Sequence, residues 1–422
     1  MKIQPLADFS FVPHLRPGDR IFAGQATAEP RGLLRRLLEE ARAGLLPQVH
    51  LFVGPIYSDT FAQGLPESIQ LESYGAMGRL SPLARAGRLS VFPGHLSALG
   101  REIEAGRFRA DVALLQLRPA RAEPGWNLGL ARDLIFQAAG QARCILGEHQ
   151  PMMPACLGGE FPADLPLAAL AQAEAGPVEL PVPPPDATAR AIAARIAGLV
   201  PDGAVLQLGI GTIPNSICAA LSGHRDLGLH SGVVGDGLVD LVESGALTNA
   251  RKERDRGVSI AGIAMGTRRL SAHVDGNPAF RLAGPEVTHD LATIASLSRV
   301  HAINSALEVD LTGQIGAEAV GGRYLGGVGG LVDFQRAAQA SAGGRAIIAL
   351  PAVTAGGESR VVARVGTVTC ARSDADIFVT EHGVADLRGQ PFEARARRMI
   401  AIAAPQHREA LDRAWHAMRG VS

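Results

Sequence analysis

A stretch in the second half of the chain leads an apolar run into a loop of small residues. It reads "DLGLHSGVVGDGLVDL" over residues 226–241 and contains Ser231, Gly232 and Asp236. Glycine has no Cβ, so such a loop can bring backbone close to a small molecule. The sequence therefore indicates a binding loop here, and the question is which side chain in it does chemistry.

A second loop lies in "LQLGIGTIPNS", where Gly209 and Gly211 follow a strand pattern and precede a helix pattern. Backbone N–H groups and the helix dipole at such a point can receive an anion. The dinucleotide fingerprint would need glycine at Pro214 and an acidic residue about 20 residues on, so no nicotinamide cofactor is expected. The alternative is a tight turn that needs glycine only for steric reasons.

The densest glycine loop is "GRYLGGVGGLVDF". Its glycines are Gly326, Gly327, Gly329 and Gly330, around Val328. So many glycines cost conformational entropy, and a ligand lying against bare backbone would recover it. Leu331 and Val332 stand where a P-loop would need its lysine. The alternative is a flexible or closely packed turn.

Polar residues are scattered through the second half without a spacing that selects a catalyst. They are Asn304, Glu308, Asp310, Gln314, Arg360, Glu381, His382 and Arg388. Isolated polar groups on helices or strand ends are more often satisfied structural groups than catalysts.

Strand and helix patterns alternate on both sides of a proline-rich segment. The strand patterns are "QVHLFVG", "LSVFPG" and "DVALLQL" before it, and "AVLQLGI", "VHAIN", "RAIIALP" and "DIFVT" after it. Prolines at 181 and 183–185 predict an extended linker, and Asp186 is placed to cap a helix that buries Ile192, Ile196 and Leu199. We predict two α/β domains with mostly parallel sheets, over residues 1–180 and 186–422.

The two halves also repeat each other. "GDRIFAGQATAEPRGLL" and "DGAVLQLGIGTIPNSIC" both read as strand, glycine-bearing turn and helix start with a proline. "HLFVGPIYSD" and "GLHSGVVGDG" both read as strands entering glycine-bearing loops. These similarities predict two related domains.

The amino-acid composition excludes several classes of function. The 422 residues are 47% hydrophobic, and Lys+Arg and Asp+Glu are both 41, so no net charge would attract nucleic acid or an anionic membrane. No run reaches the roughly 18 apolar residues of a membrane span, and no signal peptide is evident, so a cytoplasmic protein is expected. Cys144, Cys156, Cys218 and Cys370 are scattered, which predicts buried free thiols and no metal site.

Taken together, the sequence segments quoted above resemble the acetyl-CoA hydrolase/transferase family, which includes acetate, succinate and 4-hydroxybutyrate CoA-transferases. The similarity runs through nearly the whole chain, from "GDRIFAGQATAEP" through "DVALLQLRPARAEPGWNLGL", "DGLVDLVESGALTN" and "INSALEVDLTGQIGAE" to "YLGGVGG" and "VTEHGVADLRG". The resemblance implies two CoA-transferase domains with the active site between them and a homo-oligomer, expected to be a dimer. The implied ligands are coenzyme A, as a thioester, and a small carboxylic acid.

The resemblance also assigns roles to residues. The loop around Gly326 matches the family loop that lies against CoA, so Gly327, Val328 and Gly329 are candidate binding residues whose N–H groups can hold a thioester oxyanion. The loop with Gly209 and Gly211 matches another that lines the cleft. These are expectations carried by the resemblance alone.

At the family's nucleophile the sequence departs from the pattern. Family transferases have a glutamate there that carries CoA as a glutamyl thioester, and the ungapped match places Gly232 at that position. Ser231, Asp236 or Glu286 in "GPEVTHD" are the conceivable substitutes. Three hypotheses follow: CoA transfer by another route, acyl-CoA hydrolysis, or thioester binding without turnover.

Overall fold

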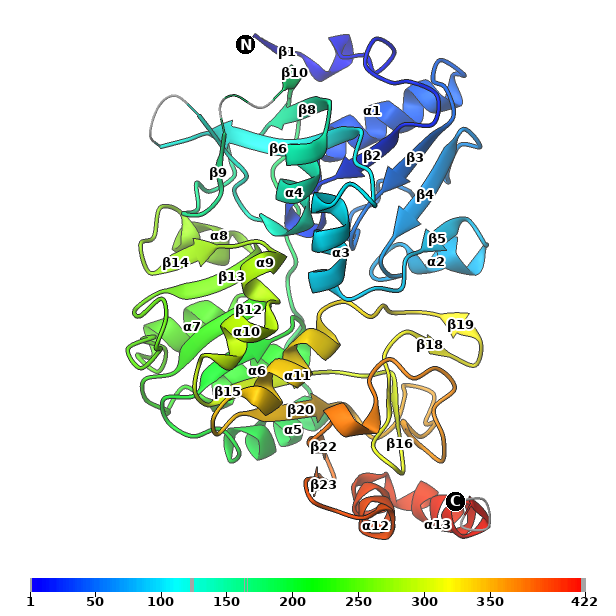
Figure 1. The fold of residues 1–422 in the computed structure, drawn as a ribbon, viewed down its shortest axis with the longest axis vertical. Coiled ribbons are helices and arrows are strands. Elements are labelled where there is room, and N and C mark those ends of the chain that lie inside the picture. Colours follow the sequence, from blue (N-terminus) through cyan, green and yellow to red (C-terminus); the bar gives the residue numbers. More distant parts are fainter. Residues whose placement is uncertain (1, 122–124, 163, 165, 419–422) are drawn as a thin grey trace. The chain divides into compact units, whose positions relative to one another are not determined.

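The computed structural model describes residues 2–121, 125–162, 164 and 166–418, which form two compact units. Unit 1 comprises Met1–Pro181 and Ile260–Thr288, and unit 2 comprises Val182–Ser259 and His289–Ser422 (Figure 1). The sequence predicted a single domain boundary at the proline-rich segment, with residues 186–422 forming one domain. The chain crosses there and also returns to unit 1 for Ile260–Thr288.

Unit 1 is built on a parallel sheet. Its strand order is β1 (Ile3–Gln4), β10 (Leu167–Gln172), β8 (Cys144–His149), β6 (Val112–Pro119), β2 (Arg20–Ala23), β3 (Val49–Phe52), β4 (Ile69–Ser73) and β5 (Leu89–Val91). The short strands β7 (Trp126–Asn127) and β9 (Glu160–Phe161) extend β6 in antiparallel fashion, and β13 (Ser259–Ala264) pairs with β14 (Phe280–Leu282).

Helices pack on both faces of this sheet, as the continuous apolar strands require. Alternating side chains such as Ile21 and Phe22 enter different hydrophobic cores, one containing the leucines of α1 and the other residues of α3 and α4. The helices of unit 1 are α1 (Arg31–Arg42), α2 (Ser81–Arg85), α3 (Leu96–Glu104), α4 (Asp133–Gln141), α8 (Arg268–Val274) and α9 (Pro285–Thr288), with 3-10 turns at Leu6–Asp8 and Ala26–Ala28.

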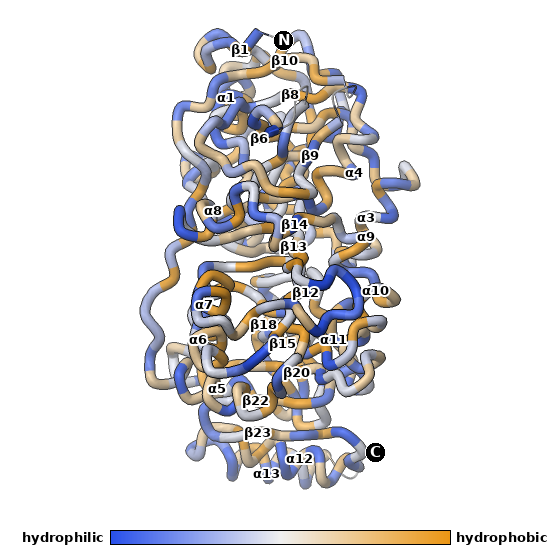
Figure 2. Tube along the Cα trace, turned by 90° about the vertical axis from the view of Figure 1, so that its left-hand side faces the viewer, coloured by the Kyte–Doolittle hydropathy of each residue, from blue (hydrophilic) through white to orange (hydrophobic). Residues whose placement is uncertain are grey.

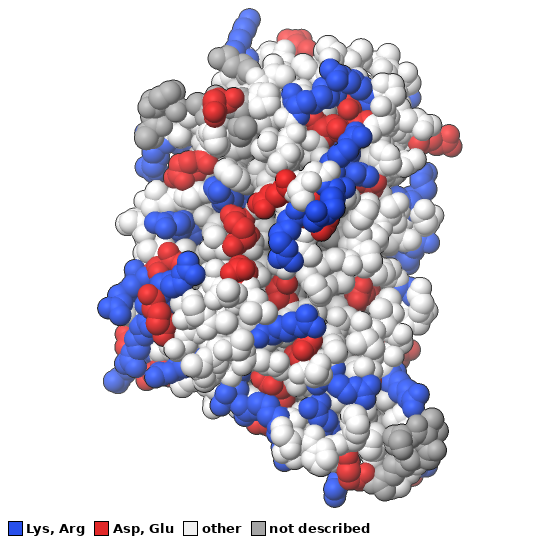
Figure 3. Space-filling view, in the orientation of Figure 1, with Lys and Arg blue, Asp and Glu red and all other residues white. Residues whose placement is uncertain are grey.

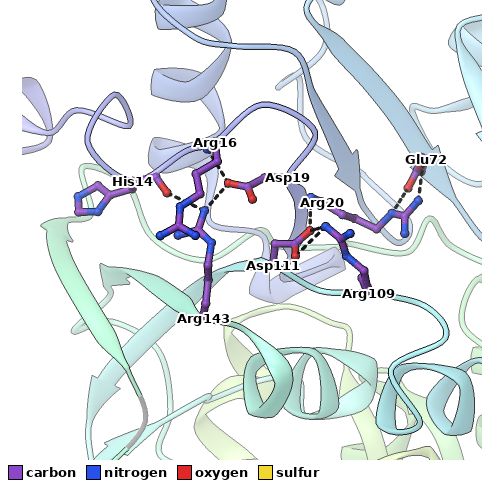
Figure 4. A network of polar contacts seen from close by, with 8 residues as sticks. All are labelled: His14, Arg16, Asp19, Arg20, Glu72, Arg109, Asp111 and Arg143. Atoms are coloured by element: carbon purple, nitrogen blue, oxygen red, sulfur yellow. Dashed lines mark hydrogen bonds and ion pairs between the residues drawn. The ribbon is translucent and has the colours of Figure 1, made fainter.

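Ion pairs close the amino edge of the unit 1 sheet (Figure 4). Arg143, just before β8, contacts the carboxylate of Asp19, just before β2. Asp111, just before β6, accepts the N–H of Arg20 at 2.9 Å, and the Arg20 guanidinium pairs with Glu72 at 2.8 Å. Ligands of doubly wound proteins bind at the opposite, carboxyl edge, so this network is structural.

Unit 2 has its own mostly parallel sheet. Its strand order is β12 (Gly228–Val234), β11 (Val205–Leu208), β15 (Val300–Asn304), β20 (Arg345–Ala349), β22 (Ile377–Thr380) and the antiparallel β23 (Gly383–Asp386). Short pairings join β16 (Glu308–Asp310) with β17 (Ile315–Gly316) and β21 (Val361–Val362), and β18 (Ala319–Val320) with β19 (Arg323–Tyr324).

The helices of unit 2 complete its cores. They are α5 (Ala187–Ala197), α6 (Thr212–Ala220), α7 (Gly237–Glu243), α10 (Leu291–Ala295), α11 (Leu331–Ala340), α12 (Phe392–Ile402) and α13 (Pro405–Met418), with a 3-10 turn at Arg372–Asp374. The predicted cap of α5 is confirmed, because the Asp186 carboxylate accepts the N–H of Ala189 at 2.7 Å. Ile192 and Ile196 are buried as expected, whereas Leu199 lies beyond the end of the helix.

The two units share one topology, which confirms the predicted relationship between the halves. In unit 1, β2 pairs with β3 on one side and β6 on the other; in unit 2, β11 pairs with β12 and β15. The next strand along the chain lies on one side, and a later strand lies on the other. The similar segments after β2 and β11 therefore sit at equivalent switch points, where α/β proteins bind ligands.

The predicted strands and the predicted buried thiols are also confirmed. Every predicted strand pattern forms a strand. The four cysteines are free and buried. Most of the buried residues are apolar, and Figure 2 shows how hydrophobic and hydrophilic residues alternate along the chain. On the face drawn in Figure 3, acidic and basic side chains are interspersed. No helix in the described part of the chain is long and apolar enough to cross a membrane.

Candidate active site

A cavity of about 310 Å³ opens at the switch point of unit 2. Its lining comes from the ends of β11, β15 and β20 and the first turns of α6: Gly209, Ile210, Thr212, Ile213, Pro214, Ile217, Ile303, Asn304, Ser305 and Ala349. None of these lining residues is ionisable. The cavity therefore suits a largely apolar group that makes a few hydrogen bonds.

The turn after β11 has glycine at position 211 because of its backbone conformation. Gly211 has φ 110° and ψ −171°, a backbone conformation essentially restricted to glycine. A Cβ built at Gly211 would meet nothing within 4 Å, so the backbone angle and not crowding explains glycine there. Beneath the turn, Asn304 and Gln207 exchange amide hydrogen bonds of 2.9 and 3.3 Å, which fixes neighbouring strands.

Ser231 has a structural role in the described contacts. The residue is fully buried within β12, and its hydroxyl lies 2.9 Å from the carbonyl oxygen of Leu208 and 2.8 Å from that of Val233. Either carbonyl can accept its single proton. The hydroxyl thus ties β12 to the end of β11.

Gly232 packs directly against the imidazole of His289. A Cβ built at Gly232 would lie 2.7 Å from Cε1 and 2.8 Å from Nε2 of that ring. Carbon atoms in favourable contact are about 3.5–4.0 Å apart, so the ring occupies the volume that a side chain at 232 would need. Glycine is therefore a steric requirement at this position.

The same ring fills the space beside Gly330. A Cβ there would lie 2.5 Å from both Nε2 and Cδ2 of His289. The ring also packs on Phe334 of α11, with ring centroids 4.7 Å apart. His289 thus brings together two predicted site segments, strand β12 and the glycine loop around Val328, with Nε2 facing both glycines.

The environment keeps this imidazole neutral. The pKa of His289 is lowered to about 3, mainly by burial and further by the nearby His230. A neutral imidazole carries one N–H donor and one acceptor nitrogen. At neutral pH the group can donate a hydrogen bond without adding a charge to the site.

The loop around Val328 is held by a buried carboxylate behind it. Glu318 accepts hydrogen bonds from the hydroxyls of Tyr324 at 3.1 Å and Thr369 at 2.8 Å. Its backbone carbonyl accepts the N–H of Gly326 at 2.9 Å. Glycine at 326 is required because a Cβ would lie 2.1 Å from the carbonyl oxygen of Ala317.

The remaining loop residues are placed as follows. Gly327 is half-buried and Val328 is buried. Gly329 adopts a positive φ of 54°, which favours glycine, and a Cβ there would meet nothing within 4 Å. The loop leads directly into α11, which begins at Leu331.

The two predicted acidic substitutes lie in different units. Asp236 is half-buried and immediately precedes α7 in unit 2. Glu286 lies in α9 of unit 1, where its carboxylate accepts a hydrogen bond of 2.5 Å from Gln137.

Several of the scattered polar residues make structural contacts. One carboxylate oxygen of Asp310 accepts the backbone N–H groups of Thr312 and Gln314 at 2.9 and 3.0 Å. Glu381 accepts the N–H of Ala352 at 2.9 Å. In the described part of the chain, no group of three or more His, Cys, Asp and Glu side chains is arranged to hold a metal ion.

Sequence reasoning missed His289, although the residue stands in the quoted segment "GPEVTHD". One available signal is the following Asp290, which caps α10 by accepting the N–H of Thr293 at 2.7 Å. The other signal is the glycine at 232 itself, since a lost side chain invites a neighbour to fill its volume.

Fold and site together define a doubly wound α/β protein with an uncharged cavity at the carboxyl edge of a parallel sheet. Residues 266–415 match the family model described as "Acetyl-CoA hydrolase/transferase C-terminal domain". The 4-hydroxybutyrate coenzyme A transferase of Clostridium kluyveri is 31% identical over 396 residues, which is 93% of this chain and 92% of the relative.

Two further similarities extend over nearly the whole length. An acetyl-CoA hydrolase of Kluyveromyces lactis is 27% identical, covering 98% of this chain and 90% of the relative. The crystal structure of RipA from Yersinia pestis superposes with a TM-score of 0.90 at 30% identity, covering 97% of this chain and 96% of that one. The chain belongs to the acetyl-CoA hydrolase/transferase family, whose enzymes use CoA thioesters as substrates.

Proposed function

We propose that this enzyme moves coenzyme A between a short acyl-CoA and a small carboxylic acid without forming a glutamyl thioester. The observation that carries the proposal is the imidazole of His289 in the volume beside Gly232, which leaves no room for a carboxylate. The relative from Clostridium kluyveri supports transfer as the reaction class.

The glycine loops supply the binding surface in this proposal. Gly209 lines the uncharged cavity, which would take the apolar part of the thioester, and Gly211 shapes the turn that follows. Backbone N–H groups of Gly327, Val328 and Gly329, with Gly326 holding the loop in place, would approach the thioester carbonyl. Preorganised backbone donors of this kind stabilise an oxyanion without adding charge to the enzyme.

The reaction balances without an enzyme nucleophile. A carboxylate oxygen of the acceptor acid attacks the thioester carbon, and the C–S bond breaks. CoA leaves as a thiolate, and the donor and acceptor acids remain joined as a mixed anhydride. The thiolate then attacks the acceptor's carbonyl carbon, forming the new thioester and releasing the donor acid as a carboxylate. No proton is consumed, so the enzyme must mainly orient the partners and stabilise two tetrahedral oxyanions.

Hydrolysis is the second candidate, and one observation favours it specifically. With no carboxylate at 232 to capture the acyl group, the first nucleophile to reach the carbonyl can be water. The acetyl-CoA hydrolase relative is consistent with that outcome. Transfer and hydrolysis differ only in which nucleophile enters.

The test incubates the purified full-length protein with acetyl-, propionyl-, butyryl- and succinyl-CoA, with and without small carboxylic acids. Thioesters are separated chromatographically and free thiol is followed in parallel. We expect a new thioester only when donor and acceptor are both present, with intersecting initial-velocity lines and no CoA adduct in the peptide of residues 226–241.

Release of free thiol in the absence of an acceptor acid would show that the protein hydrolyses acyl-CoA and would contradict the transfer reaction. Binding by calorimetry without turnover would make the protein a thioester-binding module. Parallel velocity lines with an adduct on Ser231 or Asp236 would restore a covalent mechanism. Absence of binding at millimolar acyl-CoA would overturn the whole proposal.

A further inference from the structure

A second cavity of unit 2, of about 330 Å³, has no role in the proposed function. It lies where the turn between β16 and β17 meets the start of α12 and the end of α13 (Figure 1). Its walls include Arg364, Arg372, Phe392, Trp415 and Met418. The cavity at the switch point shares none of its lining residues, so the two cavities are separate.

One wall of this second cavity is positively charged. The Nε–H of Arg364 donates to the sulfur of Met418 at 3.2 Å, and the guanidinium of Arg372 lies 5.4 Å from the ring centroid of Phe392. Among the residues that the structure describes, neither guanidinium pairs with a carboxylate. Arginine presents a planar fork of N–H donors that matches carboxylate and phosphate groups. This wall therefore has the chemistry of an anion site.

A third guanidinium adds to the positive charge. Arg395 donates to the carbonyl oxygens of Thr312 and Arg372, both at 3.1 Å. Burial lowers the pKa of Arg395 and the nearby charge of Arg372 lowers it further, while Asp376 offsets part of this effect. The like charges therefore repel each other. An anion bound at Arg364 and Arg372 would relieve that repulsion.

The carboxylates near this wall already have other partners. Asp310 is buried, and its oxygens accept the hydroxyl of Thr312 at 2.7 Å and the side-chain amide of Gln314 at 3.0 Å. Asp374 pairs with Arg336 at 2.9 Å. Neither carboxylate therefore serves as a counter-ion for the arginines that line the cavity.

The rest of the cavity offers aromatic surface. Phe392 is 49% exposed, which is high for a large apolar side chain in this protein. Trp415 is 8% exposed, and its indole N–H donates to Glu393 at 3.1 Å, so the surface that it leaves for a ligand is apolar. Planar groups stack on aromatic faces and on guanidinium planes. The cavity thus combines cations with surfaces that suit a flat ring.

A cavity in unit 1 shows that arginines in a lining are not sufficient. Its volume is about 400 Å³, and Arg35 and Arg36 line it. There, however, Arg35 pairs with Asp59 at 2.6 Å and Arg36 pairs with Glu40 at 3.1 Å. The unit 1 cavity is compensated by the protein's own carboxylates, whereas the arginines of the second unit 2 cavity are not.

We propose that the second cavity of unit 2 binds a small organic anion that carries a planar ring. Arg364 and Arg372 would hold the anionic group, and the ring would lie against Phe392 and Trp415. Nucleoside monophosphates and aromatic carboxylates share this chemistry. The site is separate from the cavity used in the proposed function and does not depend on that function.

The test uses the cavity's own tryptophan as the reporter. The chain has two tryptophans, Trp126 and Trp415. Trp126→Phe in the full-length protein leaves Trp415 as the single one. Adenosine monophosphate and benzoate should each change its emission in a saturable way, after correction for ligand absorbance. Inorganic phosphate and adenosine each lack one of the two features, so both should bind at least about tenfold more weakly.

Variants of the lining test each contact in the same background. Arg364→Gln and Arg372→Gln should each weaken both ring-bearing anions roughly 10- to 100-fold, because each removes a charged hydrogen-bond donor. Phe392→Ala should weaken them roughly three- to tenfold. Arg413→Gln is the matched control, because Arg413 is an exposed residue of α13 that pairs with Glu409 outside the lining. It should leave both affinities unchanged.

Binding of either ring-bearing anion supports the site, and the tighter of the two tells whether it selects a phosphate or a carboxylate. No response of Trp415 to either anion at millimolar concentration would overturn the proposal. Unchanged affinity after both Arg364→Gln and Arg372→Gln would do the same. Inorganic phosphate bound as tightly as adenosine monophosphate would contradict the role of the ring.

Discussion

In unit 1, the turn after β2 carries Gln25, whose amide donates to Asp133 at 2.6 Å and accepts from Tyr74 at 2.7 Å. In unit 2, the equivalent turn after β11 carries Ile210, and a cavity of about 310 Å³ remains. Both turns sit at the switch point of a parallel sheet. The first is closed by a polar side chain, and the second leaves a cavity.

The backbone differs in the same sense. Ala26 adopts a positive φ of 55°, which is unfavourable for a residue with a Cβ, whereas Gly211 adopts its φ of 110° as a glycine. Unit 1 tolerates strain because the fully buried methyl group of Ala26 packs in the turn. The comparison teaches that topology provides the place for a site, and that a few side chains decide whether the place is filled.

Filling the unit 2 cavity should have a large effect on ligand binding. Gly209 has no positive φ, and a Cβ there meets only Pro214, at 4.0 Å. Gly209→Leu should therefore fold but weaken acyl-CoA binding roughly 100-fold, about 2.7 kcal/mol, measured by calorimetry. Gly223→Leu, on an exposed loop where a Cβ also has open space, is the control. Unchanged affinity for Gly209→Leu would show that the ligand binds elsewhere.

Opening the unit 1 switch point should cost stability. Gln25→Ala leaves the Tyr74 hydroxyl and one oxygen of Asp133 without their amide partner, so the free energy of unfolding should fall by about 2–4 kcal/mol in urea titrations. Gln70→Ala on the exposed side of β4 is the matched control and should change it by less than about 0.5 kcal/mol. Equal losses in both variants would mean that Gln25 does not close the turn.

The two units should also respond to pH with opposite signs. Burial raises the pKa of Asp133 to about 6, so its contribution to stability is present at low pH and is lost as pH rises toward 6. The pKa of His289 is lowered to about 3, so its contribution is present above pH 6.5 and is lost as pH falls toward 3.

Urea titrations at several pH values between 4 and 6 test these two opposite pH dependences of the free energy of unfolding. Asp133→Asn should make stability rise more steeply with pH, and His289→Gln should make it rise less steeply. Each slope should differ from that of the unmodified protein by up to about 1.4 kcal/mol per pH unit. A shift of the same sign in both variants would refute the assigned environments.

Much of the fold could be predicted from local sequence patterns. The β-branched runs such as "VHAIN" and the Asp186 cap specify local structure within a few residues, and each formed as predicted. The repeated strand–turn–proline pattern was also informative, because both copies occupy switch points. The return of Ile260–Thr288 to unit 1 depends on packing between distant segments, which no local pattern reports.

The candidate site was less accessible to sequence reasoning. The glycine loops were visible because glycine density is a property of the sequence itself, but the hydrogen bonds of Ser231 to Leu208 and Val233 were not. His289 was missed because its importance comes from contact with Gly232 and Gly330, about 40 to 60 residues away along the chain. A volume shared by distant residues can be recognised only in three dimensions.

The shared volume of positions 232 and 289 also restricts how such a site can change over generations. A glutamate arriving at Gly232 while the imidazole is present would collide with it, so that order of substitutions passes through a damaged protein. Replacing His289 by a smaller residue first leaves a cavity, which is costly but tolerable, and only then can a carboxylate be accommodated. The order of the two substitutions is thereby fixed by sterics, and a lineage with glycine and histidine at these positions is separated from one with a carboxylate by an intermediate that is poorer than either.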